Sequence, residues 1–415
     1  MPEYLAPGVF VEEVRFRSKS IEGVSTSTSA FVGSTLKGPH AAASPPITSF
    51  VEFERIYGGL DNLSYSAASD AAPDVPNYMA HAVRAFFENG GQRLYVARTF
   101  VPRVDGGGRV VTDHENNFTL PGTEPGVSAY SAALALLESI ADISIIAAPG
   151  HSALATASFA AVQQALIAHA EKMRYRVAVL DTPAGQTVDQ ARQTRAKINS
   201  SYAALYYPWV VIANPLARLG NKSNPTQITL PPSGFVCGIY ARTDIERGVW
   251  KAPANEVVRG ALHFERDLTK ENQDLLNPQG VNCLRSFPGR GHLLWGARTA
   301  SAAPEWKYVN VRRYCIYLEC SIEQGTQWVV FEPNGEPVWA NVRQTISAFL
   351  NNEWRSGALL GTKPEQAFFV RCDRSTMTQN DIDNGRLICE IGIAPVKPAE
   401  FIIFRIGHKT AEAHS

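Results

Sequence analysis

The sequence predicts a multidomain protein of mixed class, with a middle α/β domain of βαβ units and a C-terminal α+β domain. Three observations support this fold class. The chain has 415 residues, which is more than one hydrophobic core usually serves. Its middle third alternates short apolar runs with longer amphipathic stretches, as βαβ units do. Beyond Gly289 the pattern changes to long helical stretches followed by several strand-like runs, which is typical of an α+β domain.

The N-terminal part begins with a strand-like run. In YLAPGVFVEEV, which starts at Tyr4, Pro7-Gly8 precedes alternating residues from Val9 onward. Because chain ends usually fray unless another element holds them, this strand needs a partner. The elements predicted next are a buried strand around Ala30–Val32, a brief helix ending at Gly58-Gly59, a helix in NYMAHAVRAFFENGG, a strand in QRLYVAR and a surface loop over Val101–Pro125.

The middle part carries the βαβ pattern. The elements predicted in order are a helix near Ser128–Ile140, a strand in ISIIAAP, a helix over Ala155–Met173, a strand in RVAVLD, a helix over Val188–Ser200 and a strand in YPWVVIANP. Strands separated in this way by helices form a parallel or mostly parallel sheet. A polar loop then leads to Ser233, which we expect to cap a helix in FVCGIYARTDIER.

The C-terminal part begins with a helix in RRYCIYLECSIEQG that ends at Gly325, followed by a predicted strand in WVVFEPNG. PVWANVRQTISAFLNNEWRSG is the most clearly amphipathic helix, with Gly357 at its end and one apolar face made of Trp339, Val342, Ile346, Phe349 and Leu350. Three strands are predicted after it, in QAFFVRC, RLICEIGIAPV and AEFIIFRI. In the last strand both faces are apolar and want burial, with Phe401 and Ile403 on one face and Ile402, Phe404 and Ile406 on the other.

Composition excludes several classes of protein. Lys+Arg and Asp+Glu both number 39, and no block of like charges stands out, so the chain has no long-range attraction for nucleic acid or for an anionic membrane. The six cysteines show neither a CxxC pair nor a metal-ligand spacing, and we expect neither a metal nor another cofactor. No segment approaches the roughly 20 apolar residues of a membrane span, so no membrane insertion is expected.

The α/β middle domain raises the hypothesis of an enzyme, because ligands bind at the carboxyl ends of such strands. The candidates are His151, after IIAAPG, and Asp181, after VAVLD, but neither a phosphate loop nor a nucleophile motif accompanies them. Ser34–Lys37 matches an SxxK pattern whose companion motifs are absent. The aromatic row Tyr202, Tyr206, Tyr207 and Trp209 lacks interleaved basic residues, so we expect it to be core. No catalytic residue is assigned.

Three long stretches resemble the sheath proteins of contractile phage tails, R-type bacteriocins and extracellular contractile injection systems. They are PPSGFVCGIYARTDIERGVWKAPANE, LLNPQGVNCLRSFPGRGHLLWGART and KYVNVRRYCIYLECSIEQGTQWVVFEPNGEPVWANVR. The opening YLAPGVFVEEV and the closing DIDNGRLICEIGIAPVKPAEFIIFRI resemble the same family. The resemblance runs in order from Tyr4 to about Ile406.

The resemblance implies a role for both terminal strands. In sheath proteins the N-terminal and C-terminal arms leave their own subunit and add strands to sheets of neighbouring subunits, which is β-augmentation. Carried onto this sequence, the donated arm residues are Val9, Phe10, Val11, Glu12 and Val14 together with Phe401, Ile402, Ile403, Phe404 and Ile406, received beside strands such as Arg386–Ile393. The implied division is an N-terminal arm over 1–22, an N-terminal domain over 23–100, a linker over 101–127, a middle domain over 128–285, a C-terminal, tube-facing domain over 286–397 and a C-terminal arm over 398–415.

The resemblance also implies a mechanical function without catalysis. Subunits would form stacked hexameric rings of a helical sheath around an inner tube, in an extended metastable state, and contraction would drive the tube through a target envelope. Implied partners are further copies of the chain, the inner tube protein, and baseplate and terminator or cap proteins. Assembly would take place in the bacterial cytoplasm, as part of a phage tail or of a tail-like particle that some cells release. Two alternatives stay open, a soluble α/β hydrolase-like enzyme and a static protein that forms rings or shells.

Overall fold

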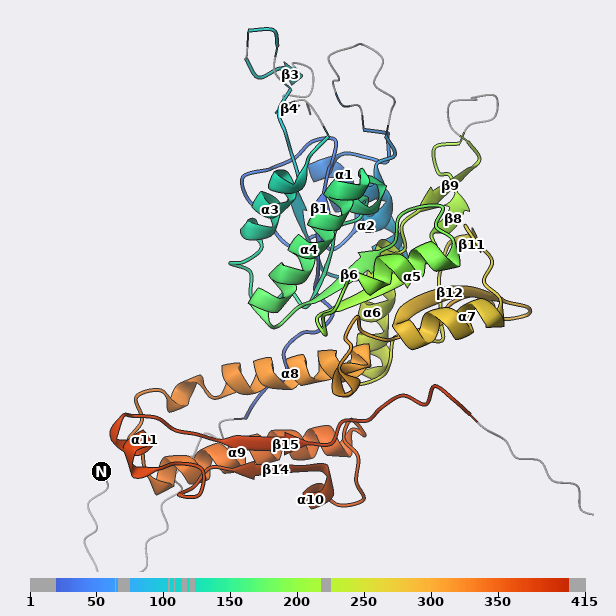
Figure 1. The fold of residues 1–415 in the computed structure, drawn as a ribbon. Helices are drawn as coiled ribbons and strands as arrows, with labels where there is room; N and C mark the ends of the chain where they lie inside the picture. Colours follow the sequence, from blue (N-terminus) through green and yellow to red (C-terminus); the bar gives the residue numbers. More distant parts are fainter. Residues whose placement is uncertain are drawn as a thin grey trace, which may run out of the picture. The chain divides into compact units, whose positions relative to one another are not determined.

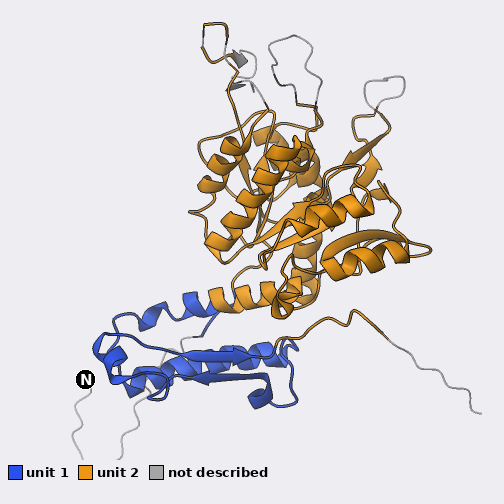
Figure 2. Ribbon diagram, viewed as in Figure 1, with its two compact units in different colours: residues 1–23, 321–394 blue, residues 24–320, 395–415 orange. Residues whose placement is uncertain are grey.

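We analysed a computed structural model of the chain (Figure 1). It describes residues 20–63, 65, 75–103, 105–107, 109–113, 118–119, 124–217 and 225–402. The chain divides into two compact units, coloured separately in Figure 2. The small unit falls within residues 1–23 and 321–394, and the large unit falls within residues 24–320 and 395–415.

The large unit is built on an eight-stranded sheet. Its strands, from one edge to the other, are β10 (Glu256–Val257), β13 (Gly291–Leu294), β12 (Val281–Phe287), β7 (Ala203–Tyr207), β6 (Val177–Asp181), β5 (Ile145–Ala147), β1 (Ser29–Gly33) and β2 (Leu94–Arg98). The strands from β12 to β2 run parallel, and β13 and β10 add an antiparallel edge. The parallel sheet predicted for the middle of the chain is confirmed.

Helices cover both faces of this sheet. One face packs against α1 (Phe50–Tyr57), α2 (Tyr78–Glu88) and α6 (Ser233–Arg247), and the other packs against α3 (Val127–Leu136) and α4 (Thr156–Met173). Alternation along the strands decides the faces: Phe31 belongs to the first core, whereas its neighbours Ala30 and Val32 belong to the second. Because both faces are buried, the middle residues of strands such as β1 and β6 are apolar, and polar side chains lie at the strand ends, as Ser29 and Asp181 do.

The remaining elements of the large unit are shorter. A three-stranded sheet has the order β11 (Ala261–Phe264), β8 (Val210–Ala213) and β9 (Gln227–Leu230). The others are β3 (Thr112–Asp113), β4 (Phe118–Thr119), α5 (Val188–Ala196), α7 (Lys270–Leu276) and the 3₁₀ helices η1 (His151–Ala153), η2 (Asn277–Gln279) and η3 (Pro304–Trp306). The strand predicted in YPWVVIANP is present as β8, but its expected place in the parallel sheet is wrong, because β7 takes that place. Pro208, which has no backbone N–H, lies between β7 and β8, and these strands belong to different sheets.

Helix α8 (Val309–Gly325) contributes its first part to the large unit and its last residues, from Ser321, to the small unit. The small unit further contains η4 (Gln327–Val329), α9 (Glu336–Arg355), α10 (Pro364–Ala367), β14 (Phe368–Arg371), α11 (Gln379–Asp383) and β15 (Glu390–Ile393). Its two strands pair antiparallel, and α9 packs against β14. The predicted α+β character of this part is confirmed.

The predicted domain boundaries differ from the structure in two places. Strands β1 and β2, from the expected domain over 23–100, lie in the same sheet as strands of the expected domain over 128–285. The C-terminal domain was expected to begin at residue 286, whereas the second segment of the small unit begins at Ser321. The β12–β13 hairpin belongs to the sheet of the large unit and extends it. Both differences depend on strands that join the large sheet by pairing with distant segments, as β12 does with β7, and local patterns do not encode such pairing.

Two local predictions are also wrong. The strand expected in WVVFEPNG is replaced by η4 and a turn, in which Val330 and Phe331 are exposed and Phe331 has φ 69°. Within the described residues this segment pairs with no strand. Ser233 is the first residue of α6 and does not cap it, because its side chain is hydrogen-bonded elsewhere.

Candidate functional site

The sheet of the small unit has two open edges. Phe368 pairs with Ile393 and Arg371 with Glu390, and within the described residues no third strand joins either side. An isolated pair of short strands is marginal in water and gains stability from further strands or a covering helix. Here α9 packs against β14, and within the described residues no strand pairs with the outer edge of either β14 or β15.

The two faces of this small sheet differ in burial. Phe368 and Val370 are partly buried, whereas Phe369 and Arg371 between them are exposed. The Phe369 ring crosses over Gly392 on the paired strand, where a Cβ atom would lie only 2.1 Å from the ring. The Arg371 guanidinium lies 5.0 Å from the centre of the same ring. Glycine at 392 therefore lets an exposed aromatic ring lie flat on the sheet.

Helix α9 buries the face that the sequence predicts. Its buried residues include Trp339, Val342, Ile346, Phe349 and Leu350, none of them more than 6% exposed. The Trp339 indole N–H donates to Asn334 Oδ1 at 2.7 Å, and Asn334 Nδ2 donates to the Arg386 carbonyl at 3.0 Å. These bonds tie the start of α9 to the segment that leads into β15. The helix thus supports the sheet whose edges are open.

The expected arm strands lie mostly outside the described residues. This holds for Val9, Phe10, Val11, Glu12 and Val14 and for Ile403, Phe404 and Ile406. Phe401 and Ile402 are described, and they are 72% and 73% exposed without strand structure. Two large apolar side chains are therefore uncovered in this chain where the C-terminal arm is expected.

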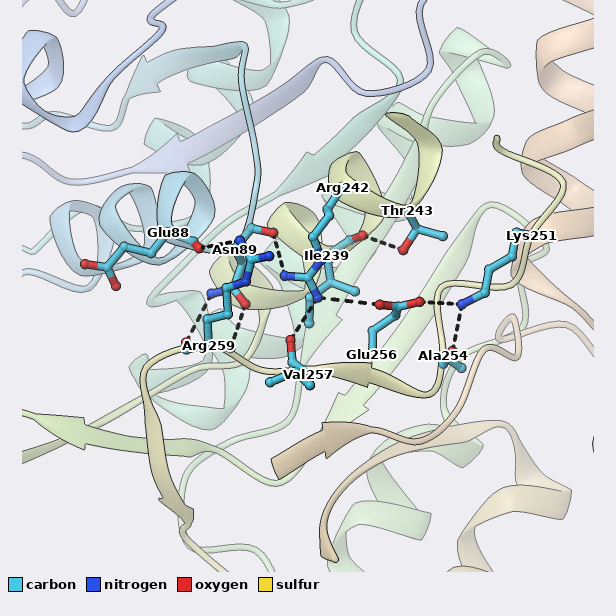
Figure 3. Close-up of polar contacts among 10 residues, drawn as sticks. All are labelled: Glu88, Asn89, Ile239, Arg242, Thr243, Lys251, Ala254, Glu256, Val257 and Arg259. Atoms are coloured by element: carbon cyan, nitrogen blue, oxygen red, sulfur yellow. Dashed lines mark hydrogen bonds and ion pairs between the residues drawn. The ribbon is translucent and has the colours of Figure 1, made fainter. Parts of the chain in front are cut away.

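Residues of the stretch PPSGFVCGIYARTDIERGVWKAPANE take part in a polar network around the buried Arg242 side chain (Figure 3). Arg242, on α6, donates to the carbonyl oxygens of Asn89 at 3.0 Å and Val257 at 2.9 Å. Glu256 accepts from Lys251 at 2.5 Å and lies 3.7 Å from Arg242. The network fastens the end of α2, helix α6 and the edge strand β10 to one another.

A second buried pair joins α6 to α8 within the large unit. Arg313 donates to both carboxylate oxygens of Asp244, at 2.9 and 2.6 Å, and also to the Thr26 carbonyl at 2.8 Å. The Arg313 and Asp244 side chains are 3% and 2% exposed. Bidentate arginine–carboxylate pairs of this kind fix geometry because both groups are planar. Thr26, close to the N-terminal end of the described chain, is thereby fastened to the large unit.

The two candidate catalytic residues, Asp181 and His151, have different hydrogen-bond partners. Asp181 accepts from the backbone N–H of Ser233 at 2.7 Å and from its hydroxyl at 2.6 Å, and burial raises the pKa of Asp181 to about 7. His151 Nδ1 lies 2.7 Å from the Ala148 carbonyl oxygen, so it carries the proton, and burial lowers the pKa of His151 to about 4. Both residues are fully buried, and the structure does not pair them with each other.

Other sequence candidates are structural. Tyr206, Tyr207 and Trp209 are buried, and the predicted core role of the aromatic row is confirmed for them. Ser34 Oγ lies 3.0 Å from the Thr99 hydroxyl. In the described part of the chain, no three His, Cys, Asp or Glu side chains gather to form a possible metal site. None of the helices described is both long and apolar enough to cross a membrane.

Residues 123–300 match the phage tail sheath protein central domain, and residues 301–408 match the phage tail sheath C-terminal domain. The chain belongs to the phage tail sheath family. This sheath-family chain is similar to the contracted helical sheath of the anti-feeding prophage (AFP), with 29% identity and a TM-score of 0.73, over 98% of this chain and 100% of that one. It is similar to the contracted sheath complex of PVC, an extracellular contractile injection system, with 27% identity and a TM-score of 0.73, over 99% of each chain.

Curated relatives match over part of their length. One relative is described as a prophage major tail sheath protein of Pseudomonas aeruginosa (strain UCBPP-PA14). It is 27% identical over 269 residues, which are 63% of this chain and 64% of that protein. The tail sheath protein of Vibrio phage KVP40 is 28% identical over 186 residues, 27% of its length. The sheath-family chain thus spans less than two thirds of the curated relatives it matches.

The polar networks were missed by sequence reasoning. Arg242 and Glu256 lie in the first family-like stretch, and Arg313 lies in the third. The sequence pattern that could have indicated these networks was the presence of arginine, asparagine and acidic residues within the long stretches that resemble sheath proteins and that also form buried helices. Their partners, however, lie far away along the sequence and could not be assigned from it.

Proposed function

We propose that this chain is a structural subunit of a contractile sheath. In this proposal it polymerises helically, as stacked hexameric rings, around an inner tube in a metastable extended state. Contraction then drives the tube through a target envelope, without catalysis by the sheath. The observation that carries the proposal is similarity over nearly the whole chain to two sheaths captured in the contracted state, AFP and PVC.

Strand donation is the proposed link between subunits. The small sheet of β14 and β15 offers two edges, and Phe401 and Ile402 expose apolar side chains at the start of the C-terminal arm. We propose that Val9–Val14 and Phe401–Ile406 of neighbouring copies extend this sheet. Backbone hydrogen bonds would supply affinity, and alternating side chains would set the register. Strand pairing of this kind holds subunits together while their bodies rotate.

The remaining partners follow from the same proposal. The unit built on α9 would face the inner tube, with baseplate and cap proteins at the two ends of the sheath. Assembly would take place in the bacterial cytoplasm, within a phage tail or a tail-like particle.

The test is assembly of the purified chain, viewed by negative-stain electron microscopy. The chain should form striated tubes, and extended and contracted tubes should differ in width. Val11→Pro should abolish tubes and leave a folded subunit by circular dichroism, because proline removes a ladder N–H and fixes φ. Val11→Thr is the matched control, since it keeps the N–H and the β-branched shape. Closed rings or discrete particles from the unaltered chain would contradict the sheath proposal, and normal tubes from Val11→Pro would contradict strand donation.

A further inference from the structure

Near the C-terminal end of the described chain lies a polar clamp centred on Glu400. Arg298 Nε and Nη2 donate to the two Glu400 carboxylate oxygens at 2.7 and 2.5 Å. Lys307 Nζ lies 3.3 Å from the same carboxylate, and the Tyr308 hydroxyl donates to it at 3.1 Å. The Arg298 and Glu400 side chains are only 8% and 17% exposed. The bidentate pair is therefore shielded from water, where charge-assisted bonds are strongest.

The arginine of this clamp is itself held by the central sheet. The Arg298 backbone N–H donates to Asn282 Oδ1 at 2.7 Å, and Asn282 Nδ2 donates back to the Arg298 carbonyl at 2.8 Å. Asn282 lies in β12, is fully buried, and also donates to the Leu205 carbonyl of β7 at 3.2 Å. A further bond, from Arg298 Nη1 to the Asn277 carbonyl at 2.8 Å, fixes the guanidinium. A pull on Glu400 is thus passed to two paired strands of the sheet.

Apolar packing of this part of the arm is only partial. None of residues 395–402 is buried, and a cavity of about 570 Å³ lies along the segment, lined among others by Trp250, Trp295 and Lys397. Apart from the clamp, Asn310 Nδ2 donates to the Val396 carbonyl at a long 3.4 Å. Within the described residues 395–402, the Glu400 contacts are thus the ion-paired attachment of the arm. Immediately after them, Phe401 and Ile402 are exposed.

We propose that Arg298, Lys307 and Tyr308 form a fixed anchor for Glu400, which sets where the C-terminal arm leaves the subunit and passes load from the arm to the central sheet. This inference rests on the proposed sheath function for its mechanical meaning. Glu400 is a positioning residue, because it would act through the strand that follows it. The anchor itself is a property of the single chain and is measurable without assembly.

The charge state of Glu400 supports this role at neutral pH. Burial by itself would raise the pKa of Glu400. The hydrogen bond and charge of Arg298, with those of Lys307 and Tyr308, outweigh burial and lower the pKa below its ordinary value. The carboxylate therefore stays ionised at neutral pH. The attraction is lost only as the pH falls through this lowered pKa.

The first experiment measures the anchor in the unassembled chain by limited proteolysis. Chymotrypsin cleaves after Phe401, and a clamped Glu400 hinders the fit of this segment into the protease. Glu400→Gln should speed cleavage after Phe401 about tenfold, because a charge-assisted pair is lost while the shape is kept. The double variant Lys307→Met with Tyr308→Phe leaves the cleaved sequence unaltered and should also speed cleavage. Lys397→Gln, an exposed charge in the same segment, is the control and should not.

The second experiment measures assembly of the same variants by electron microscopy and sedimentation. Glu400→Gln should raise the concentration needed for tubes about tenfold while its thermal unfolding stays that of the unaltered chain. Unchanged cleavage in both anchor variants, with normal tubes from the unaltered chain, would overturn the anchor and leave the sheath proposal intact. Faster cleavage without tubes from the unaltered chain would support the anchor and contradict the sheath proposal.

Discussion

At the scale of single residues, the large unit contains polar groups that are buried but satisfied. Asp181 ends β6 and meets Ser233 at the start of α6, so one carboxylate joins the end of a strand to the beginning of a helix. Its pKa of about 7 results from burial, which the two bonds from Ser233 only partly offset. Because this pKa lies above that of an aspartate in the unfolded chain, Asp181 makes the free energy of unfolding depend on pH.

We predict that Asp181→Asn changes how stability depends on pH. Between the ordinary aspartate pKa of 3.8 and about 7, the unfolded chain has lost the proton that the folded chain keeps. The stability of the unaltered protein therefore falls as the pH rises through this window, and asparagine removes that loss. Relative to that of the unaltered chain, the free energy of unfolding of Asp181→Asn should therefore rise by about 1–4 kcal/mol between pH 4 and pH 8. Urea unfolding at both pH values measures the difference.

The control for this prediction is Asp189→Asn. It makes the same change of side chain at a position where the aspartate is 77% exposed, so it separates the effect of burial from that of the substitution itself. A constant difference between the unaltered protein and Asp181→Asn across the pH range would contradict the assigned pKa.

At the scale of elements, the close contact of α2 and α6 organises one face of the sheet. A Cβ atom at Gly238 would lie 2.5 Å from the Phe86 carbonyl oxygen, and one at Gly234 would lie 2.6 Å from the Ala82 Cα. Such distances are shorter than van der Waals contact, so both positions require glycine for the two backbones to approach. Arg242 and Asn89 then hydrogen-bond across the same helix pair.

We predict that Gly238→Ala destabilises the subunit by about 1–3 kcal/mol, because the added methyl group must push α2 and α6 apart. Thermal or urea unfolding measures this loss. Gly126→Ala is a matched control, since Gly126 has φ −86° and no atom lies within 4 Å of its added Cβ. Equal stability of the two variants would show that the helices are not in the close contact described.

At the scale of the whole molecule, the chain passes between its two units three times, near residues 23, 320 and 394. The small unit is thus assembled from segments far apart in sequence, and it holds the open sheet proposed to receive arms. The sequence carries no phosphate-binding loop, and the described residues contain no cluster of three metal-ligand side chains. Under the proposed function, the energy for contraction is stored in the extended lattice during assembly.

We predict that assembled sheaths contract without nucleotide and in the presence of a chelator. Brief acid, heat or denaturant should trigger contraction, because these conditions help subunits leave a metastable arrangement. Electron microscopy of tube widths before and after treatment gives the measurement, with chelator-free samples as the control. A strict requirement for ATP or for a divalent ion would contradict the stored-energy account.

The sequence by itself determined most local elements. The strand–helix alternation from β5 through β6 to α5 was predicted because buried parallel strands are short apolar runs bounded by amphipathic helices. The buried face of α9 followed from the spacing of Trp339, Val342 and Ile346. The resemblance of long stretches to sheath proteins pointed to the family that the comparisons then established.

Only the tertiary structure decided how these elements combine. The place of β1 between β5 and β2, the end of the strand at Tyr207 and the engagement of Ser233 by Asp181 all depend on segments distant in the chain. The Arg298–Glu400 clamp spans 102 residues and could not be assigned from either motif alone. The physical reason is that periodicity reports which side chains want burial, whereas strand order and polar partners depend on which surfaces meet.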